Sequence, residues 1–204
     1  IFPLGDLDLR SGSCLPQAQL SYRVVGELNG DRSNLVLMPT YYGAWPEDLL
    51  WWVGPILDPR RWCVVIVGLL GNGRSSSPSH GSLPLPQDGD PWPVEHSDNL
   101  RAQIRLLEQV FSVERPALIL GWSMGAQLAY HWAVLEPERA QRLCCLCGTA
   151  RTTDHNRLFL LSLRRALTGD PAWDGQGFRQ EPLAGLRHFA LIYASWAASQ
   201  PWFR

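Results

Sequence analysis

The sequence predicts an α/β fold in which a mostly parallel sheet is flanked by helices, and three observations carry this prediction. Short, continuously apolar runs at residues 35–38, 63–67 and 117–120 are typical of parallel strands buried on both faces. Helical patterns separate these runs, so strands and helices alternate along the chain. One of the strands also continues directly through Gly-x-Ser-x-Gly into a helix.

The first two strands are predicted from alternation rather than from continuous apolar runs. Residues 5–9 and 19–27 alternate apolar and polar side chains on either side of a Ser-Gly turn, a pattern typical of an antiparallel pair. The last strand is predicted at residues 143–147. Its three cysteines favour core packing over a metal site, because alternation divides them between two faces: Cys144, Cys145 and Cys147.

The first helix is predicted at residues 99–111, where apolar side chains recur four, three and four positions apart. Ser97 or Asp98 can cap it. Asp98, Asn99 and Gln103 are expected to cap and bridge this helix rather than to contact a substrate. Three more helices are predicted at residues 124–135, 156–167 and 183–199.

Length and composition indicate one globular domain, residues 1–204, with no internal repeat or linker. A hydrophobic share of 46% excludes the disordered classes. The net charge of −1 predicts no nucleic-acid or membrane partner, so the partners are expected to be small molecules. All 18 basic residues are Arg, which excludes a P-loop lysine, a Schiff-base lysine and a Ser-Lys dyad.

The segments that would direct the chain to a membrane or out of the cell are not found. No run of 18 apolar residues exists, and the first residues lack the basic and apolar regions of a signal peptide. Five cysteines, an odd number, do not suggest a secreted disulfide framework. We therefore expect a soluble, cytoplasmic protein.

The motif that carries chemistry is Gly121-Trp-Ser-Met-Gly125, which lies between a buried strand and a helix. This context turns the short pattern into a nucleophile elbow with Ser123 at its tip. The helix N-terminus directs the backbone N–H of Met124 at the position where an oxyanion would form. The second N–H donor is expected from the loop at residues 39–43, which follows an apolar strand.

The chain resembles the homoserine O-acetyltransferase family, whose members have the α/β-hydrolase fold. The resemblance runs through LDLRSG, LSYRVVGELN, PTYYG, GNGRSSSPS, DNLRAQIRLL, GWSMGAQLAYHWA, GTARTTDHN and GDPAWDGQGF, in this order. It implies that Ser123 takes an acetyl group from a donor such as acetyl-CoA and passes it to a hydroxyl acceptor. It further implies that the N–H groups of Tyr41 and Met124 hold the oxyanion, that no bound cofactor or metal takes part, and that the role is in methionine biosynthesis.

The sequence departs from the family in ways that leave other functions open. The oxyanion loop reads Pro39-Thr-Tyr-Tyr-Gly43 where the transferases tend to have His-x-x-Thr-Gly, and residues 193–199 contain no arginine to bind an amino-acid carboxylate. A carboxylic-ester hydrolase, with water as the acceptor, is the first alternative. A catalytically silent binding protein with this fold is the second.

No general base can be assigned from the sequence. In this fold the acid and then the histidine follow the serine. His131 lies within the helix after Ser123, and His155 and His188 precede any seventh strand. Asp154 is more plausibly a helix cap than the acid. The acid and base are therefore expected beyond residue 204, together with a lid, two more strands and the elements of a possible homodimer. Residues 1–204 alone are expected to be a C-terminally truncated core and to be inactive.

The remaining features favour structural interpretations. Residues 68–94 are irregular and rich in Gly, Ser and Pro, and within them residues 71–75 indicate a turn rather than a phosphate-binding loop. Trp45, Trp51 and Trp52 follow the oxyanion loop, where they either form the wall of an acyl or acceptor pocket or pack on the sheet.

Overall fold

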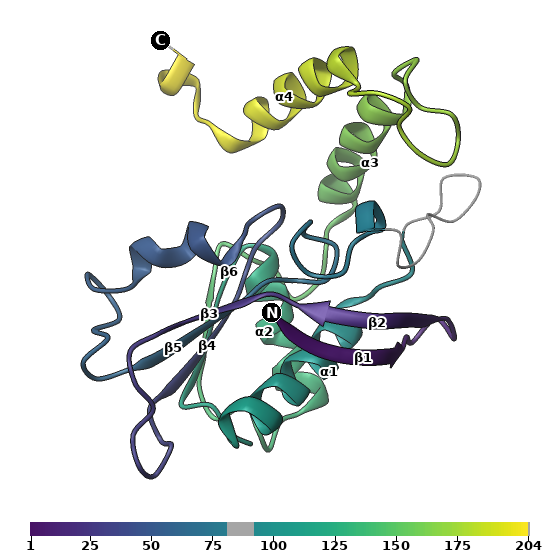
Figure 1. Cartoon of the computed structure of the whole chain (residues 1–204). Coiled ribbons are helices and arrows are strands. Elements are labelled where there is room, and N and C mark those ends of the chain that lie inside the picture. The colour runs from purple at the N-terminus through teal and green to yellow at the C-terminus, as the bar shows by residue number, and fades with distance from the viewer. Residues whose placement is uncertain (81–91, 204) are drawn as a thin grey trace. The chain divides into compact units, whose positions relative to one another are not determined.

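The computed structural model describes residues 1–80 and 92–203, which divide into two compact units (Figure 1). The first, here called the sheet unit, contains residues 1–80 and 93–150. The second, the helical unit, contains Trp92 and residues 151–203. The sequence predicts one domain, and the two units are described separately below.

The sheet unit is built on a five-stranded, mostly parallel sheet with the strand order β3-β5-β4-β6-β7. Its strands are β3 (Tyr22–Val25), β4 (Leu35–Pro39), β5 (Cys63–Val67), β6 (Leu118–Trp122) and β7 (Leu143–Leu146). Only β3 runs antiparallel to its neighbour. Every residue of β4 and β5 is buried, which confirms the interpretation of the continuous apolar runs as central parallel strands.

The predicted pairing of residues 5–9 with 19–27 is only half right. An antiparallel pair does form, but between β1 (Phe2–Asp8) and β2 (Cys14–Leu20), outside the main sheet. The chain leaves this pair at Ser21, where Ser21 N–H donates to Ser75 Oγ and Ser21 O accepts from the Gly68 N–H. Residues 22–25 then join β5, so the alternating run from 19 to 27 spans two different sheets.

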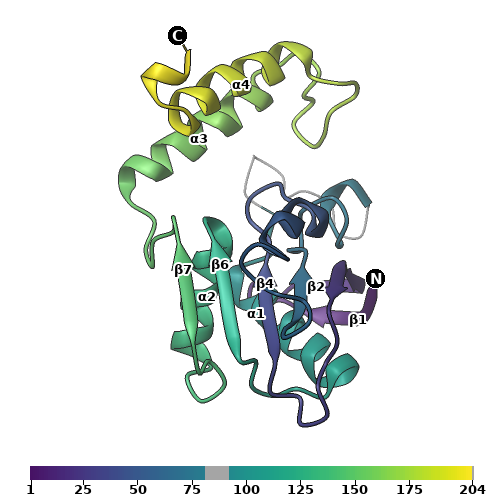
Figure 2. The same cartoon turned by 90° about the vertical axis from the view of Figure 1, so that its left-hand side faces the viewer.

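Two helices hold the strand that leads into the serine. Helix α2 (Met124–Leu135) packs against β4, β6 and β7, and α1 (His96–Leu106) packs against α2 (Figure 1). The bounds of α2 are those predicted from the sequence. Figure 2 shows α2 behind β6 and β7, and Ser123 is the residue between the end of β6 and the start of α2. The short helix η1 (Pro46–Trp52), which the sequence patterns did not predict, contacts β3 and β5.

The cap of α1 differs from the prediction. The N-cap residue is Glu95 rather than Ser97 or Asp98, and Asp98 occupies the third helical position. The buried Asp98 carboxylate accepts the N–H groups of Glu95 at 2.8 Å and Arg10 at 2.9 Å. It thereby bridges α1 to the segment after β1, as the expected bridging role requires. Asn99 and Gln103 are also buried and hydrogen-bonded.

Other predicted elements are close to those observed. The residues of predicted helix 99–111 lie in α1 and the π-helical turn η4 (Leu107–Phe111), which follows it. Cys144 packs against the core as expected, whereas Cys147 is exposed. The irregular stretch 68–94 is described up to His80 and from Trp92, and residues 81–91 lie outside the described residues.

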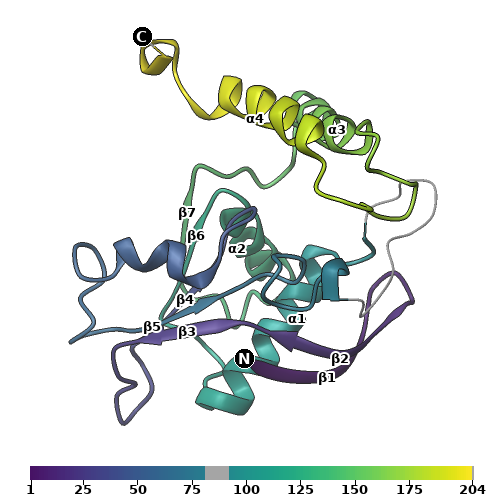
Figure 3. The same cartoon turned by 45° about the horizontal axis from the view of Figure 1, so that its top comes forward.

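The helical unit consists mainly of α3 (Asp154–Thr168) and α4 (Leu183–Ala197), which lie side by side (Figure 3). A short 3₁₀ helix, η5 (Gln200–Phe203), follows them. Thr153, not Asp154, is the N-cap of α3, because the Thr153 hydroxyl accepts the Asn156 N–H. Among the described residues, no helix is both long enough and apolar enough to cross a membrane.

Candidate active site

The serine turn between β6 and α2 has the backbone geometry of a nucleophile elbow. Ser123 has φ 53° and ψ −118°, a combination that costs a non-glycine residue on the order of 1–3 kcal/mol. Its N–H donates to Leu146 O at 2.8 Å, which continues the pairing of β6 with β7. The next residue, Met124, already begins the helix. The side chain of Ser123 is therefore held, half-buried, at the point where strand becomes helix.

Three glycines make this turn possible, because side chains in their places would strike backbone. A Cβ at Gly121 would lie 2.2 Å from Gly125 O, and one at Gly125 would lie 2.5 Å from Pro39 O. Both agree with the roles expected from the motif. The third, Gly148, follows β7, and its Cβ would lie 2.5 Å from Ser123 O. Gly148 begins the segment GTARTTDHN, but that segment does not reveal its proximity to the serine, which depends on the pairing of two strands.

The two predicted oxyanion donors lie on segments that meet at this turn. Met124 is the first residue of α2, so its N–H has no acceptor within the helix. Tyr41 follows β4 directly after Thr40, and the oxygens of Pro39 and Thr40 are the backbone atoms that crowd Gly125. The side chain of Tyr41 packs against the buried cluster that includes Trp52 and Leu49. The loop at residues 39–43 and the start of α2 therefore approach one another, as an oxyanion hole built from both requires.

Hydrogen bonds fix the oxyanion loop from the side of β5. Thr40 is fully buried, and its hydroxyl accepts the Leu69 N–H at 3.2 Å. Farther along, Asn72 Nδ2 donates to Ala44 O at 3.2 Å, and Trp45 Nε1 donates to Asn72 O at 3.1 Å. These contacts join the loop after β4 to the loop after β5 at three points. Preorganised backbone donors require such support.

The residue before the serine belongs to an aromatic cluster. The rings of Trp51, Trp52 and Trp122 lie 4.5–6.4 Å apart between centroids, a range typical of favourable aromatic pairs. Trp52 is 5% exposed and part of the core, whereas Trp122 is 36% exposed. Packing on the sheet is therefore confirmed for Trp52. Trp122 presents part of its ring to the surface directly beside Ser123.

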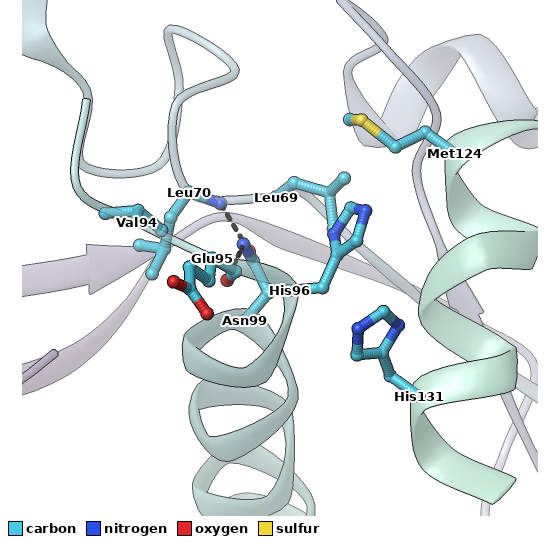
Figure 4. Close-up of a pocket in the computed structure, with 8 residues that line it drawn as sticks. All are labelled: Leu69, Leu70, Val94, Glu95, His96, Asn99, Met124 and His131. Carbon is cyan, nitrogen blue, oxygen red and sulfur yellow. Dashed lines mark hydrogen bonds between the residues drawn. The ribbon is translucent and has the colours of Figure 1, made fainter. Parts of the chain in front are cut away.

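The residue after the serine lines a pocket of about 420 Å³. Figure 4 shows this pocket between the start of α1, the loop after β5 and α2. Its lining residues are Leu69, Leu70, Val94, Glu95, His96, Asn99, Met124 and His131. All of them belong to the sheet unit. The volume falls within the ~300–1,000 Å³ that is usual for small-molecule sites.

Two imidazoles meet in this pocket. The rings of His96, from α1, and His131, from α2, are 5.0 Å apart between centroids, with an angle of 67° between their planes. His131 Nδ1 lies 2.9 Å from the Gln127 carbonyl, which can only accept, so Nδ1 carries the proton in this contact. Burial, and then the neighbouring His131, lower the pKa of His96 below its usual value, which favours the neutral ring. Neither histidine could be assigned to a pocket from the sequence, because the pairing depends on how α1 packs on α2.

No general base is in place among the residues that the structure describes. None of their imidazoles is hydrogen-bonded to Ser123, and the Nδ1 of His131 is engaged by its own helix. In the helical unit, His155 stacks on Trp196 with ring centroids 4.9 Å apart. The described residues of the sheet unit therefore bring the predicted nucleophile, Ser123, next to the two segments that are predicted to supply the oxyanion N–H groups.

The comparison with protein families agrees with this geometry. Residues 35–186 match the profile of the α/β hydrolase fold. The chain belongs to the α/β-hydrolase-fold family. The match includes both predicted oxyanion segments and the elbow, so a serine nucleophile at this turn is what membership of the family leads one to expect.

Individual relatives of this α/β hydrolase include both hydrolases and transferases. The chain is 38% identical to an ethyl acetate hydrolase of Pseudomonas veronii, over 98% of this chain and 59% of that protein. It is 32% identical to a homoserine O-acetyltransferase of Thermobifida fusca, over 88% of this chain and 52% of that protein. The solved structure of the acetyl esterase MekB covers the whole chain with a TM-score of 0.90 and 34% identity, over 60% of the MekB chain. The α/β hydrolase described here thus spans about 60% of the length of the esterases it matches.

Proposed function

We propose that this α/β hydrolase cleaves carboxylic esters of short acyl groups through an acyl-enzyme on Ser123. The observation that carries the proposal is the strained turn of Ser123 at the start of α2, beside the loop that contains Tyr41. The hydrolase and esterase relatives support water as the acyl acceptor, because they match more of the chain at higher identity than the homoserine transferase does.

The proposed reaction has two halves. Ser123 Oγ attacks the ester carbonyl carbon, its proton passes to a base, and the N–H groups of Tyr41 and Met124 stabilise the oxyanion. The tetrahedral intermediate then collapses, the C–O bond to the alcohol breaks, and the alcohol oxygen receives the proton. In the second half, water attacks the acyl-enzyme, releases the carboxylic acid and restores Ser123.

Acyl transfer to an alcohol is the second candidate, and the 32% identity to a homoserine O-acetyltransferase favours it. The two functions share the acyl-enzyme and differ only in what attacks it. Product partition separates them: the complete gene product is given an acetyl ester together with homoserine, and free acetate and O-acetylhomoserine are measured. Predominant acetate supports the hydrolase, and predominant O-acetylhomoserine supports the transferase.

Replacement of the nucleophile tests both functions. In the complete gene product, Ser123→Ala should lower kcat by about 10⁴-fold or more and abolish labelling by a fluorophosphonate probe. Ser195→Ala, at an exposed serine of α4, is the matched control and should keep full activity. Persistent labelling of the Ser123 variant would overturn the nucleophile assignment. Absence of labelling in the unsubstituted protein would support a silent binding protein instead.

Residues 1–204 expressed on their own provide a further test. They contain the serine and the oxyanion segments, but the described residues place no imidazole on Ser123. Without a base a serine hydroxyl is a weak nucleophile at neutral pH, so we expect no turnover above that of Ser123→Ala. Steady-state hydrolysis of p-nitrophenyl acetate measures this. Ser123-dependent turnover would show that a base lies within residues 1–204.

A further inference from the structure

The pocket lined by Met124 has a largely uncharged lining, unlike a site that binds charged substrates. Four of its eight lining residues are aliphatic or thioether side chains: Leu69, Leu70, Val94 and Met124. None of the eight is arginine, although the chain has 18 basic residues and all are arginines. The one charged lining residue is the carboxylate of Glu95. Arg10 Nε lies 3.7 Å from this carboxylate in an exposed ion pair, so an anionic group in the pocket would find no cation among the lining residues and one carboxylate that is already paired.

The remaining polar groups of the wall are one amide and two imidazoles. Asn99 Oδ1 accepts the Leu70 N–H at 2.8 Å, and Asn99 Nδ2 donates to Glu95 O at 3.3 Å, so this amide shapes the wall. The pKa of His96 is lowered by burial, so this ring does not supply a positive charge at neutral pH. His131 donates Nδ1–H to Gln127 O, which makes its Nε2 an acceptor when the ring is neutral. A hydroxyl or ester oxygen suits such a wall, and a carboxylate does not.

Contacts connect this pocket to both oxyanion segments. Met124 lines the pocket and supplies one predicted oxyanion N–H. Leu69 also lines it, and the Leu69 N–H donates to the hydroxyl of Thr40, the residue before Tyr41. Two of the pocket's walls are thus held by the backbone that would surround the reacting carbonyl. Ser123 is not one of the lining residues, so a group held in this pocket would lie next to the reacting carbonyl on the Met124 side.

The size of the pocket indicates which part of an ester it holds. An acetyl group has three heavy atoms and occupies about 100 Å³ at ~30 Å³ for each water-sized group. The pocket is about four times larger, at 420 Å³. We propose that it is the alcohol-side subsite and that it selects esters of uncharged alcohols over esters of alcohols that carry a carboxylate. This inference rests on the proposed function and specifies the substrate class of the same site.

The experiment compares two acetate esters with the same number of carbons in the alcohol, one ending in a methyl group and the other in a carboxylate. Butyl acetate and 4-acetoxybutyrate share the acyl group and the length of the alcohol, but the second carries a carboxylate. With the complete gene product at pH 7.5 we expect kcat/KM to be at least tenfold higher for butyl acetate. Acetate release is the readout for both esters. A ratio near one, with hydrolysis still dependent on Ser123, would overturn the inference and leave the proposed function standing.

A charge placed in the wall gives the second arm. Leu70→Arg adds a guanidinium to the pocket and should reduce the preference for butyl acetate by tenfold or more, mainly through a lower KM for 4-acetoxybutyrate. Val134→Arg adds the same charge to α2 at a residue that is 76% exposed and does not line the pocket, and it should leave the ratio unchanged. Equal effects of the two variants would show that net charge, not the pocket, sets the preference. If Leu70→Arg does not fold, Val94→Arg tests the same wall.

A loss of all Ser123-dependent hydrolysis has a different meaning. If the unsubstituted complete gene product hydrolyses neither ester, the proposed function fails, and the alcohol-side assignment fails with it. The selectivity ratio and the dependence on Ser123 therefore separate the two proposals, because only the ratio reports on the pocket.

Discussion

The two neighbours of Ser123 lie in contrasting surroundings. Trp122, on the strand side, contacts two other tryptophan rings, and one of these belongs to the core. Met124, on the helix side, lines a pocket with two histidines and three aliphatic residues. The strand side of Ser123 carries a partly exposed aromatic cluster, and the helix side has space for a ligand.

This contrast indicates that the two sides of Ser123 have different roles. Aromatic packing on the strand side is suited to hold the turn in its strained conformation, because large rings bury much area and make directional contacts. Substitutions of the residues that line the pocket on the helix side should affect the turn less. Stability and selectivity should therefore respond to substitutions on different sides of Ser123.

The largest expected effect comes from the glycines that hold both sides together. Gly121→Ala and Gly125→Ala place a Cβ within 2.5 Å of a backbone oxygen, so we expect each to lower the free energy of unfolding by about 3 kcal/mol. Urea denaturation of the chain measures the free energy of unfolding. Gly30→Ala is the matched control, because a Cβ there meets nothing within 4 Å, and it should change stability by no more than about 0.5 kcal/mol. Similar costs at all three positions would mean that crowding at the elbow is not the cause.

The next prediction tests the contrast directly. Trp122→Ala should lower the free energy of unfolding by about 2 kcal/mol, less than for a fully buried tryptophan because Trp122 is 36% exposed. Met124→Ala should lower the free energy of unfolding by about 1 kcal/mol, because the side chain of Met124 is half-buried. It should also raise kcat/KM for acetate esters of bulkier alcohols relative to that for ethyl acetate. Urea denaturation and a series of acetate esters, from ethyl to hexyl, measure the two effects.

Trp51→Ala serves as the control for aromatic packing. Because Trp51 is 55% exposed, this substitution should lower the free energy of unfolding by less than Trp122→Ala does. If Met124→Ala were the more destabilising substitution, or Trp122→Ala alone changed the selectivity for the alcohol, the assignment of the two sides would have to be reversed.

The elements that the sequence predicts well are those whose signals are local. The buried strands at β4, β5 and β6 are continuous apolar runs, and α2 begins directly after the serine and ends before Pro137. The elbow is likewise encoded within five residues. Local patterns suffice there because steric demands act between chain neighbours.

The elements that the sequence does not predict depend on distant partners. The switch of strands at Ser21 is held by Ser75, 54 residues away, so the alternating pattern alone could not show it. The crowding of Ser123 by Gly148 depends on the pairing of β6 with β7. The pocket needs α1, α2 and the loop after β5 together, and His96 carries no motif that marks it. Lone histidines on helices are uninformative until their neighbours are known.

The smallest expected effect concerns the charge state of the pocket side. His96 has a lowered pKa in the folded protein because of burial and of His131, while a hydrogen bond with Gln127 and the charge of Glu95 act in the opposite direction. The unfolded chain therefore binds a proton at this residue at a higher pH than the folded chain does. Between neutral pH and the lowered pKa the unfolded state holds more protons, so the free energy of unfolding should fall as the pH is lowered from 7.5 to 5.5.

A ring that cannot be protonated should remove part of this dependence. We expect the loss of stability between pH 7.5 and 5.5, measured by urea denaturation, to be smaller in His96→Phe than in the unsubstituted chain. His80→Phe is the matched control, because His80 is exposed. This variant should lose as much stability between pH 7.5 and 5.5 as the unsubstituted chain does. An unchanged pH dependence in His96→Phe would mean that this ring is not held neutral by its surroundings. Because Trp122 and its ring partners carry no ionisable side chain, the same pH change should leave the strand side of Ser123 unaffected, which separates the two sides by charge as well as by packing.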